Sequence, residues 1–511
     1  MDWGRIARLS LVMFGLAGAS VAADKSPVAD AAEQRNRALV RTLLSAGADV
    51  NAAQVDGMTA LHWAVYNDDT DTAGLLVRSG ADVNAANLYG VPPLALACTN
   101  GNAELVKLLL DAGADANASL RGGETVLMTA ARAGSLEAVK ALLARGANPN
   151  ARERRDQTAL MWAAAEGHAA VVRALIDGGA DVRATLKSGF TPLFFAVREG
   201  HIDVTRTLLE AGVKVNETLQ RGELRPELAV KDAVGKGTSP LLMAVQNGHF
   251  ELALALVDAG ADPNDQRTGF TPLHAMTWVR KPDASDTGDP APIGSGRLTS
   301  LQFVRALVKR GANVNARLDK GAPRPPATAS RLGTEGATPF LMAADREDVP
   351  LMRLLLELGA DPLLPNVDNS TPLMAAAGLG TAAPDEEAGT EAEAREAVQL
   401  LLDLGADINA VDNNGDTAMH GAAYGNFPTI VQLLADRGAD PDVWKQPNKQ
   451  GRTPLFIAEG YREVRPTVSR PTIEAVHRLM LAAGLPTDGP RPRTRDIYEK
   501  LPEPARKPTK P

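Results

Sequence analysis

The sequence predicts an all-α fold, an α-solenoid of tandem helix-turn-helix repeats joined by short β-hairpin fingers. Three observations predict it: a glycine turn that recurs every 33 residues, a threonine-led motif between successive turns, and leucine-rich segments with helical spacing. The chain has 511 residues, which exceeds the usual size of a domain with a single compact core. An elongated array of repeats is therefore favoured. The first six turn glycines are Gly47, Gly80, Gly113, Gly146, Gly179 and Gly212.

The threonine-led motif is expected to start the first helix of each repeat. It reads T-A-L-H from Thr59, T-A-L-M from Thr158, T-P-L-F from Thr191, T-P-L-H from Thr271 and T-P-L-M from Thr371. A threonine hydroxyl can cap the free N–H groups of a helix, and proline at the first helical position costs no hydrogen bond. A helix should therefore begin directly after each motif.

The second helix of each repeat follows another glycine. Gly167, Gly200 and Gly248, each followed by histidine, open a turn between the two helices, and the leucine spacing within 105–110 predicts the second helix. The turn glycine then ends that helix, because glycine adopts the left-handed conformation that closes it. A single repeat cannot bury both helix faces, so stability should come from contacts between neighbours.

The pairing of T-P-L-H with G-A-D-x-N at this period resembles the ankyrin repeat family. The resemblance spans about residues 31–485, as an N-terminal half repeat and eleven units within a predicted array over 24–485. Residues 31–46 should contribute one capping helix with Arg35, Arg37 and Arg41 facing solvent. The resemblance implies a platform for binding other proteins and does not specify the ligand.

The two ends of the chain differ from the array. Residues 1–23 are predicted to be a signal peptide, because Arg5 and Arg8 precede an apolar stretch over 9–19 that ends in small residues. That stretch is shorter than the roughly 20 residues that cross a bilayer, which favours cleavage over retention as an anchor. Residues 486–511 are rich in proline, lysine and arginine and are predicted to be a disordered tail.

Extra residues lengthen the period after Gly212. Insertions of this kind usually lie in loops on an exposed edge, where they add contact surface without disturbing the core. Neutral drift in tolerant loops is the alternative explanation. The predicted insertions lie near 217–236, 280–299, 317–335, 380–393 and 460–471.

Candidate catalytic residues coincide with repeat positions. Six of the seven histidines do so: His62, His274 and His420 end the threonine-led motif, and His168, His201 and His249 lie in the inter-helix turn. The resemblance implies that the motif histidines bridge neighbouring repeats, and His477, on the last helix, is interpreted as a cap residue. Cys98, the one cysteine, should be a small core residue that forms no intrachain disulfide. No zinc or phosphate-loop motif occurs, so we expect no enzyme, no catalytic residue, no metal and no cofactor.

The sequence supports a partner-binding surface better than it supports a catalytic site. Aromatic and basic residues recur in one column of the first helix, in the inter-helix turns and in the fingers, a mixture typical of interfaces. Packing against neighbouring repeats is the alternative for the helix column. The candidates are Trp63, Tyr66, Leu88, Tyr89, Arg121, Arg154, Arg155, Trp162, Lys187, Phe190 and Phe195.

These observations predict a non-catalytic protein–protein interaction scaffold, exported to the periplasm or the cell exterior. It would bind a protein partner through the concave groove of the array and its finger edge. The net charge of −8 argues against a nucleic-acid partner, and we expect a monomer without a membrane span once the signal is cleaved. The alternatives are an intracellular or membrane-anchored adaptor, or an enzyme whose site the insertions form.

Overall fold

The computed structural model describes residues 26–219, 237–283, 290–320, 330–462, 467–488 and 491. The predicted signal peptide and most of the predicted tail and of the 217–236 insertion lie outside them. Within the described residues the regular structure is helical, with no strand. The chain divides into two compact units, unit 1 ending at Asp181 and unit 2 beginning at Val182.

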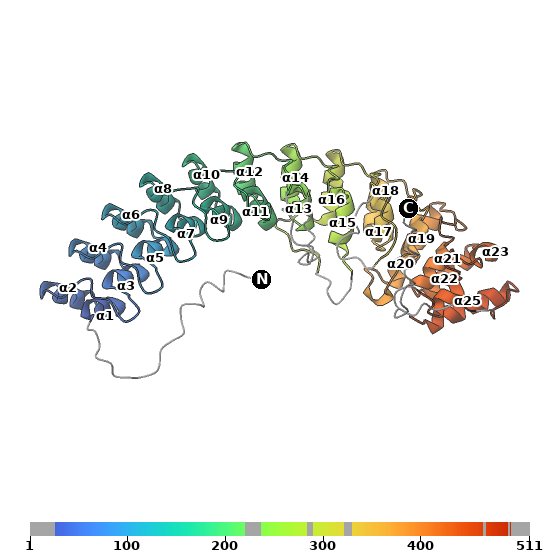
Figure 1. Ribbon diagram of the computed structural model, residues 1–511. Helices are drawn as coiled ribbons and strands as arrows, with labels where there is room; N and C mark the ends of the chain where they lie inside the picture. The colour runs from blue at the N-terminus through green and yellow to red at the C-terminus, as the bar shows by residue number, and fades with distance from the viewer. Residues whose placement is uncertain are drawn as a thin grey trace, which may run out of the picture. The chain divides into compact units, whose positions relative to one another are not determined.

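Unit 1 is a stack of antiparallel helix pairs (Figure 1). The first helices of its repeats, α1, α3, α5, α7 and α9, pack side by side in one layer, and the second helices α4, α6, α8 and α10 pack in another. The bounds are α1 Pro27–Glu33, α2 Arg37–Ser45, α3 Ala60–Tyr66, α4 Thr70–Arg78, α5 Pro93–Asn100, α6 Ala103–Asp111, α7 Val126–Arg132, α8 Leu136–Ala144, α9 Ala159–Glu166 and α10 Ala169–Asp177.

Unit 2 continues the pairing with longer connections. The first helices again contact one another in the order α11, α13, α15, α17, α19, α21 and α24. The bounds are α11 Pro192–Glu199, α12 Ile202–Glu210, α13 Pro240–Gln246, α14 Phe250–Asp258, α15 Pro272–Arg280, α16 Ser300–Lys309, α17 Pro339–Ala344, α18 Val349–Glu357, α19 Pro372–Ala376, the 3₁₀ turn η2 Pro384–Glu386, α20 Glu391–Asp403, α21 Ala418–Tyr424, α22 Pro428–Asp436, α23 Pro441–Trp444, α24 Pro454–Ala458 and α25 Arg470–Ala482.

The first helices begin where the threonine-led motif predicts. Thr59 caps α3 by accepting the N–H of His62, and Thr271 caps α15 by accepting the N–H of His274. In each cap the imidazole Nδ1 accepts the threonine N–H in return, at 3.2 Å and 3.4 Å. The reciprocal pair satisfies two backbone donors that a helix start otherwise leaves free.

The connections that the sequence predicts as β-hairpin fingers are tight turns. Within the described residues the one isolated antiparallel bridge joins Ser119 and Thr125. Elsewhere a finger closes on short backbone bonds, such as Gln54 N–H to Met58 O at 2.9 Å and Gly57 N–H to Gln54 O at 2.8 Å. A loop of this length has no room for a ladder of strand hydrogen bonds.

The N-terminal repeat is more complete than predicted. The sequence predicts one capping helix over 31–46, whereas the structure has the pair α1 and α2. The proline at position 27 starts α1, which packs against α3 as the first helices of later repeats do. The predicted half repeat is therefore a helix pair within the described residues.

The inserted segments of unit 2 pack against neighbouring repeats. Between α15 and α16, the Ser295 N–H donates to His249 Nδ1 at 2.9 Å. Before α17, the Arg331 N–H donates to the Gly380 carbonyl at 2.8 Å, which joins two insertions to each other. The described parts of the insertions thus contact the repeats, while most residues of 290–299 remain exposed.

Candidate functional site

Exposed apolar side chains occupy the first two fingers of unit 1. Leu88 and Tyr89 are 62% and 68% exposed, and Val55 in the preceding finger is 91% exposed. The two fingers touch, because the Leu88 N–H donates to the Asp56 carbonyl at 2.9 Å. The sequence candidates did not include Val55, although it lies two residues before Gly57 as Leu88 lies two residues before Gly90. This equivalent position in the repeat could have identified Val55 as a candidate.

The aromatic pair on α3 extends this surface. Tyr66 is 43% exposed, and its ring meets the half-buried ring of Trp63 edge-on, with 5.7 Å between centroids. The Trp63 indole N–H donates to Gln54 Oε1 at 2.7 Å, which ties the ring to the first finger. We call Val55, Trp63, Tyr66, Leu88 and Tyr89 the finger surface.

The basic candidates of unit 1 lie on the next two fingers. Arg121 is exposed and donates to the Leu88 carbonyl, which brings it to the finger surface. Arg154 and Arg155 are exposed at the following finger tip. Trp162 is half-buried beneath the Arg132 guanidinium, 4.7 Å from its ring centroid, so it contributes mainly to packing.

The three candidates in unit 2 differ in exposure. Lys187 is exposed, Phe190 is half-buried and Phe195 is only 7% exposed. The Arg198 guanidinium lies 5.5 Å from the Phe190 centroid and 5.3 Å from that of Phe195, covering both rings. Little of Phe195 is therefore open to a partner, which fits the packing alternative for the helix column.

Several repeat histidines bridge neighbouring repeats. The Nε2 of His62 lies 3.0 Å from the Val91 carbonyl and that of His274 lies 3.2 Å from the Ala337 carbonyl. Because Nδ1 accepts the threonine N–H, Nε2 carries the proton that makes the bridge. Burial lowers the pKa of His274 to about 4, so this imidazole is neutral at pH 7 and serves structure.

Unit 2 contains a buried charge cluster where the insertions meet the α17–α18 turn. Arg346 Nη1 lies 3.0 Å from Asp283 Oδ1, with both side chains at most 4% exposed. Arg280 forms a bidentate pair with Asp348, at 2.8 and 3.1 Å. Ser330 Oγ donates to Asp345 Oδ1 at 2.9 Å. Two insertions and the turn are thus held together by charged groups.

Several carboxyls of this cluster have raised pKa values. Burial raises the pKa of Asp345 to about 6. Burial, with the nearby Asp345 charge, raises the pKa of Glu387 to about 8 and raises that of Glu347 as well. Glu347 Oε2 and Glu387 Oε1 accept no hydrogen bond from the described residues. No group of His, Cys, Asp and Glu in the described part of the chain is placed to hold a metal ion. A buried carboxyl oxygen without a hydrogen-bond partner is costly when charged, which favours the protonated forms of Glu347 and Glu387.

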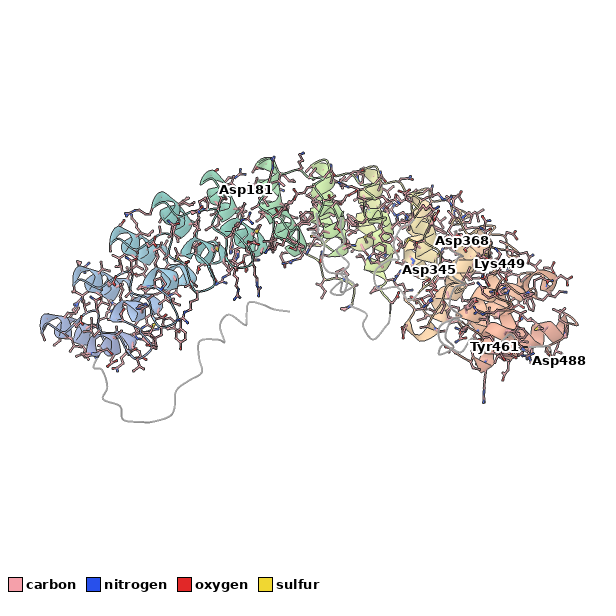
Figure 2. The ribbon with its side chains drawn as sticks, in the orientation of Figure 1. Asp181, Asp345, Asp368, Lys449, Tyr461 and Asp488 are labelled. Carbon is pink, nitrogen blue, oxygen red and sulfur yellow. The ribbon has the colours of Figure 1, made fainter. Side chains whose placement is uncertain are left out.

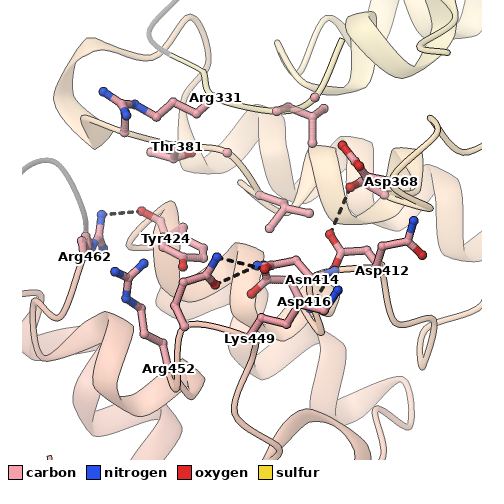
Figure 3. A pocket seen from close by; sticks show the side chains of 18 residues that line it. Arg331, Asp368, Thr381, Asp412, Asn414, Asp416, Tyr424, Lys449, Arg452 and Arg462 are labelled. Atoms are coloured by element: carbon pink, nitrogen blue, oxygen red, sulfur yellow. Dashed lines mark hydrogen bonds between the residues drawn. The ribbon is translucent and has the colours of Figure 1, made fainter. Parts of the chain in front are cut away.

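A cavity of about 410 Å³ lies nearby in unit 2 (Figure 3). The insertion segments 331–333 and 379–382 line it on one side. Three successive fingers line it on another side, with Asp368, Ser370, Asp412, Asn413, Asn414, Asp416, Lys449, Gln450 and Arg452. Tyr424 and Arg462 complete the lining. Figure 2 labels Asp368 and Lys449 at this cavity and Asp345 in the buried charge cluster. The sequence did not predict the cavity, because residues far apart in the chain form it and no short motif marks it.

The described residues contain no helix long and apolar enough to span a bilayer. This finding concerns the helices alone.

Comparison with known proteins matches the repeats directly. The family model described as ankyrin repeats (3 copies) matches residues 11–87, 76–153, 127–218 and 388–466. The model of the single ankyrin repeat matches 236–267 and 335–367. Together these matches cover more than half of the chain.

Individual relatives align over short segments. An ankyrin repeat protein of fowlpox virus (strain NVSL) is 47% identical over 49 residues, 10% of this chain and 11% of that protein. The E3 ubiquitin-protein ligase KEG of Arabidopsis thaliana is 28% identical over 204 residues, 36% of this chain. The chain spans only 11% of the length of either relative. The crystal structure of the human ASB11 ankyrin repeat domain is 26% identical, with a TM-score of 0.39, and aligns in full with 47% of this chain.

The family models match the fingers and helix pairs that the structure displays in both units. Repeats of this kind are generally non-enzymatic platforms for protein–protein interaction. The chain belongs to the ankyrin repeat family.

Proposed function

We propose that the chain is an exported, non-catalytic scaffold that binds a protein partner through the finger edge of unit 1, with the face of the first helices as the adjoining part of the contact. The observation that carries this proposal is the exposure of Val55, Leu88 and Tyr89 on two touching fingers. Exposed apolar groups that lie together, instead of singly, are typical of interaction sites.

The chemistry of this surface suggests the character of the partner. Tyrosine and tryptophan are enriched among the residues that dominate binding energies, and Tyr66, Tyr89 and Trp63 supply them here. Arg121 contacts the same surface, and Arg154 lies on the finger that follows that of Arg121. The partner should therefore present an apolar patch bordered by acidic groups.

Replacing Leu88 and Tyr89 together by serine should weaken partner capture at least about tenfold, since it removes two apolar side chains that are mostly exposed. The measurement is quantitative mass spectrometry of proteins recovered on the immobilised full chain from the exported fraction. The matched control is Ile293→Ser, which changes a side chain that is 98% exposed in unit 2. Equal recovery with the double variant and the control would refute the finger-edge assignment.

Export has its own test. N-terminal sequencing of the protein isolated from its host should find a chain that starts at Ala23 or Asp24, because small residues precede these positions as a signal peptidase requires. A chain that starts at Met1 would instead support the intracellular or anchored adaptor. This result does not depend on the outcome of the capture experiment.

A further inference from the structure

Three arginines and three aspartates lie on different sides of the unit 2 cavity, and Lys449 lies next to the acidic side. Figure 3 shows Arg331, Arg452 and Arg462 on one side and Asp368, Asp412 and Asp416 on the other. Two walls of opposite charge produce a field across the space between them. A ligand that carries both charges would gain from both walls.

Arg462 brings a positive charge that forms no ion pair with an acidic side chain among the described residues. Its guanidinium donates to the carbonyls of Tyr424 at 2.7 Å and Ala423 at 2.8 Å, and to Asn426 Oδ1. These acceptors fix the side chain but carry no net charge. Burial lowers the pKa of Arg462 to about 10, which still leaves it protonated at pH 7. An anion in the cavity would be attracted to it at reduced dielectric screening.

Arg331 is held at the cavity by its backbone, and its side chain remains available. Its N–H donates to the Gly380 carbonyl at 2.8 Å. A Cβ on Gly380 would lie 2.7 Å from the Leu332 nitrogen, so glycine is needed for the two insertions to meet. The Arg331 guanidinium and the Lys449 ammonium form no hydrogen bond or ion pair with a described residue. Both can therefore bind an anion without breaking a contact.

Hydrogen bonds also fix the carboxylates on the acidic side of the cavity. Asp412 accepts from Ser370 Oγ at 3.1 Å and from two backbone N–H groups at 2.8 Å. Asp416 accepts from Asn448 Nδ2 at 2.8 Å and from Asn414 Nδ2. These bonds hold two carboxylates in place beside the cavity. Asp368 is exposed, and its carboxylate forms no ion pair within the described part of the chain.

We propose that this cavity binds a small zwitterionic ligand, with the ligand carboxylate against Arg331 and Arg462 and its ammonium group against Asp368. The volume of about 410 Å³ lies in the range of small-molecule sites, roughly 300–1,000 Å³. The acidic wall disfavours polyanions, and the arginine wall disfavours a simple cation. Free amino acids and short peptides with open ends carry the required pair of charges.

The test is calorimetric titration of the full chain with ω-amino acids of increasing length and with the dipeptide Ala-Ala. At least one compound should bind with a dissociation constant of about 1 mM or lower, and its N-acetylated and its amidated forms should each bind at least about tenfold more weakly, because each has lost one charge. A blocked decapeptide that contains lysine and glutamate distinguishes the source of the charges. If it binds the natural chain more tightly than the Arg331→Met and Asp368→Asn variants and the small compounds fail, side chains of a protein supply the two charges.

Two variants test whether the charged side chains of the cavity bind the ligand. Arg331→Met and Asp368→Asn should each weaken binding about tenfold while leaving the thermal unfolding curve unchanged, since neither side chain supports the fold. Arg297→Met and Asp436→Asn are the controls, because they remove the same charges from exposed positions outside the cavity lining. The proposal is overturned if no probe binds, if blocked and open forms bind equally, or if the wall variants bind as the controls do.

Discussion

Replacing Arg346 by methionine is expected to destabilise the α17–α18 region by about 3–5 kcal/mol, the usual cost of removing one partner from a buried ion pair. Asp283 would stay buried without the guanidinium 3.0 Å away. Arg346 also donates to the Lys281 carbonyl at 2.6 Å, and its charge lowers the pKa of Asp345 and of Glu387. A single substitution thus removes the positive charge that stabilises three buried carboxyl groups.

Hydrogen exchange of the full chain measures this effect, because opening energies in a repeat array are local. Peptides covering α17 and α18 should lose protection, while those of unit 1 should not. Arg353→Met is the matched control: its pair with Glu396 has both side chains more than half exposed, so the loss should stay within about 1 kcal/mol. Adding Asp283→Asn to Arg346→Met should restore part of the protection. Equal losses for Arg346→Met and Arg353→Met would show that the buried pair does not stabilise this region.

The repeat could be predicted from the sequence because each of its parts is local. The cap of Thr271 on α15 and the turn at Gly260 depend on residues within a few positions of one another, and the same chemistry recurs at a fixed period. The histidine column was predicted for the same reason. Its bridging role came from the family resemblance. The bonds of His62 and His274 confirm it for these two, whereas His420 Nε2 forms no hydrogen bond with a described residue.

The cavity and the buried charge cluster could not be predicted in this way. Arg331 meets Gly380 across 49 positions, and Asp283 meets Arg346 across 63, in segments that have no period. Which insertion contacts which repeat depends on packing in three dimensions, and isolated charges in a loop are usually solvated. Single residues gave no sign that these would be buried.

The exposure of the predicted binding residues depends on their place in the repeat as well as on residue type. Tyr89 at a finger tip is exposed, whereas Phe195 on a first helix is covered by its neighbours. The sequence placed both in one set of candidates because both are large and apolar. The difference in exposure between Tyr89 and Phe195 depends on Arg198, which stacks on the rings of Phe190 and Phe195. No periodic pattern in the sequence predicts this stacking.

The stability of unit 2 should fall as pH rises from about 6 to about 8. Burial raises the pKa of Asp345 to about 6 and that of Glu387 to about 8, from 3.8 and 4.5. In this window the folded chain binds more protons than the unfolded chain, so raising the pH favours unfolding. On the acid side, burial lowers the pKa of His274 and His420 to about 4, so the contribution of these neutral imidazoles to stability is lost as pH drops from about 6.5 to about 4. An optimum near pH 6 is expected.

Glu387→Gln should remove much of the loss on the alkaline side. Glutamine has the same shape and no charge, so the variant should match the natural chain near pH 5 and exceed it by about 2–4 kcal/mol near pH 8. Hydrogen exchange of peptides from α17 to α20, corrected for the intrinsic pH dependence of exchange, provides the measurement. Glu396→Gln, at an exposed pair, should leave the pH profile unchanged. If the Glu387→Gln and Glu396→Gln profiles have the same slope above pH 6, Glu387 is ionised in the folded chain. The cost of its burial would then be met by Lys281 and Arg346, the cations that face the cluster.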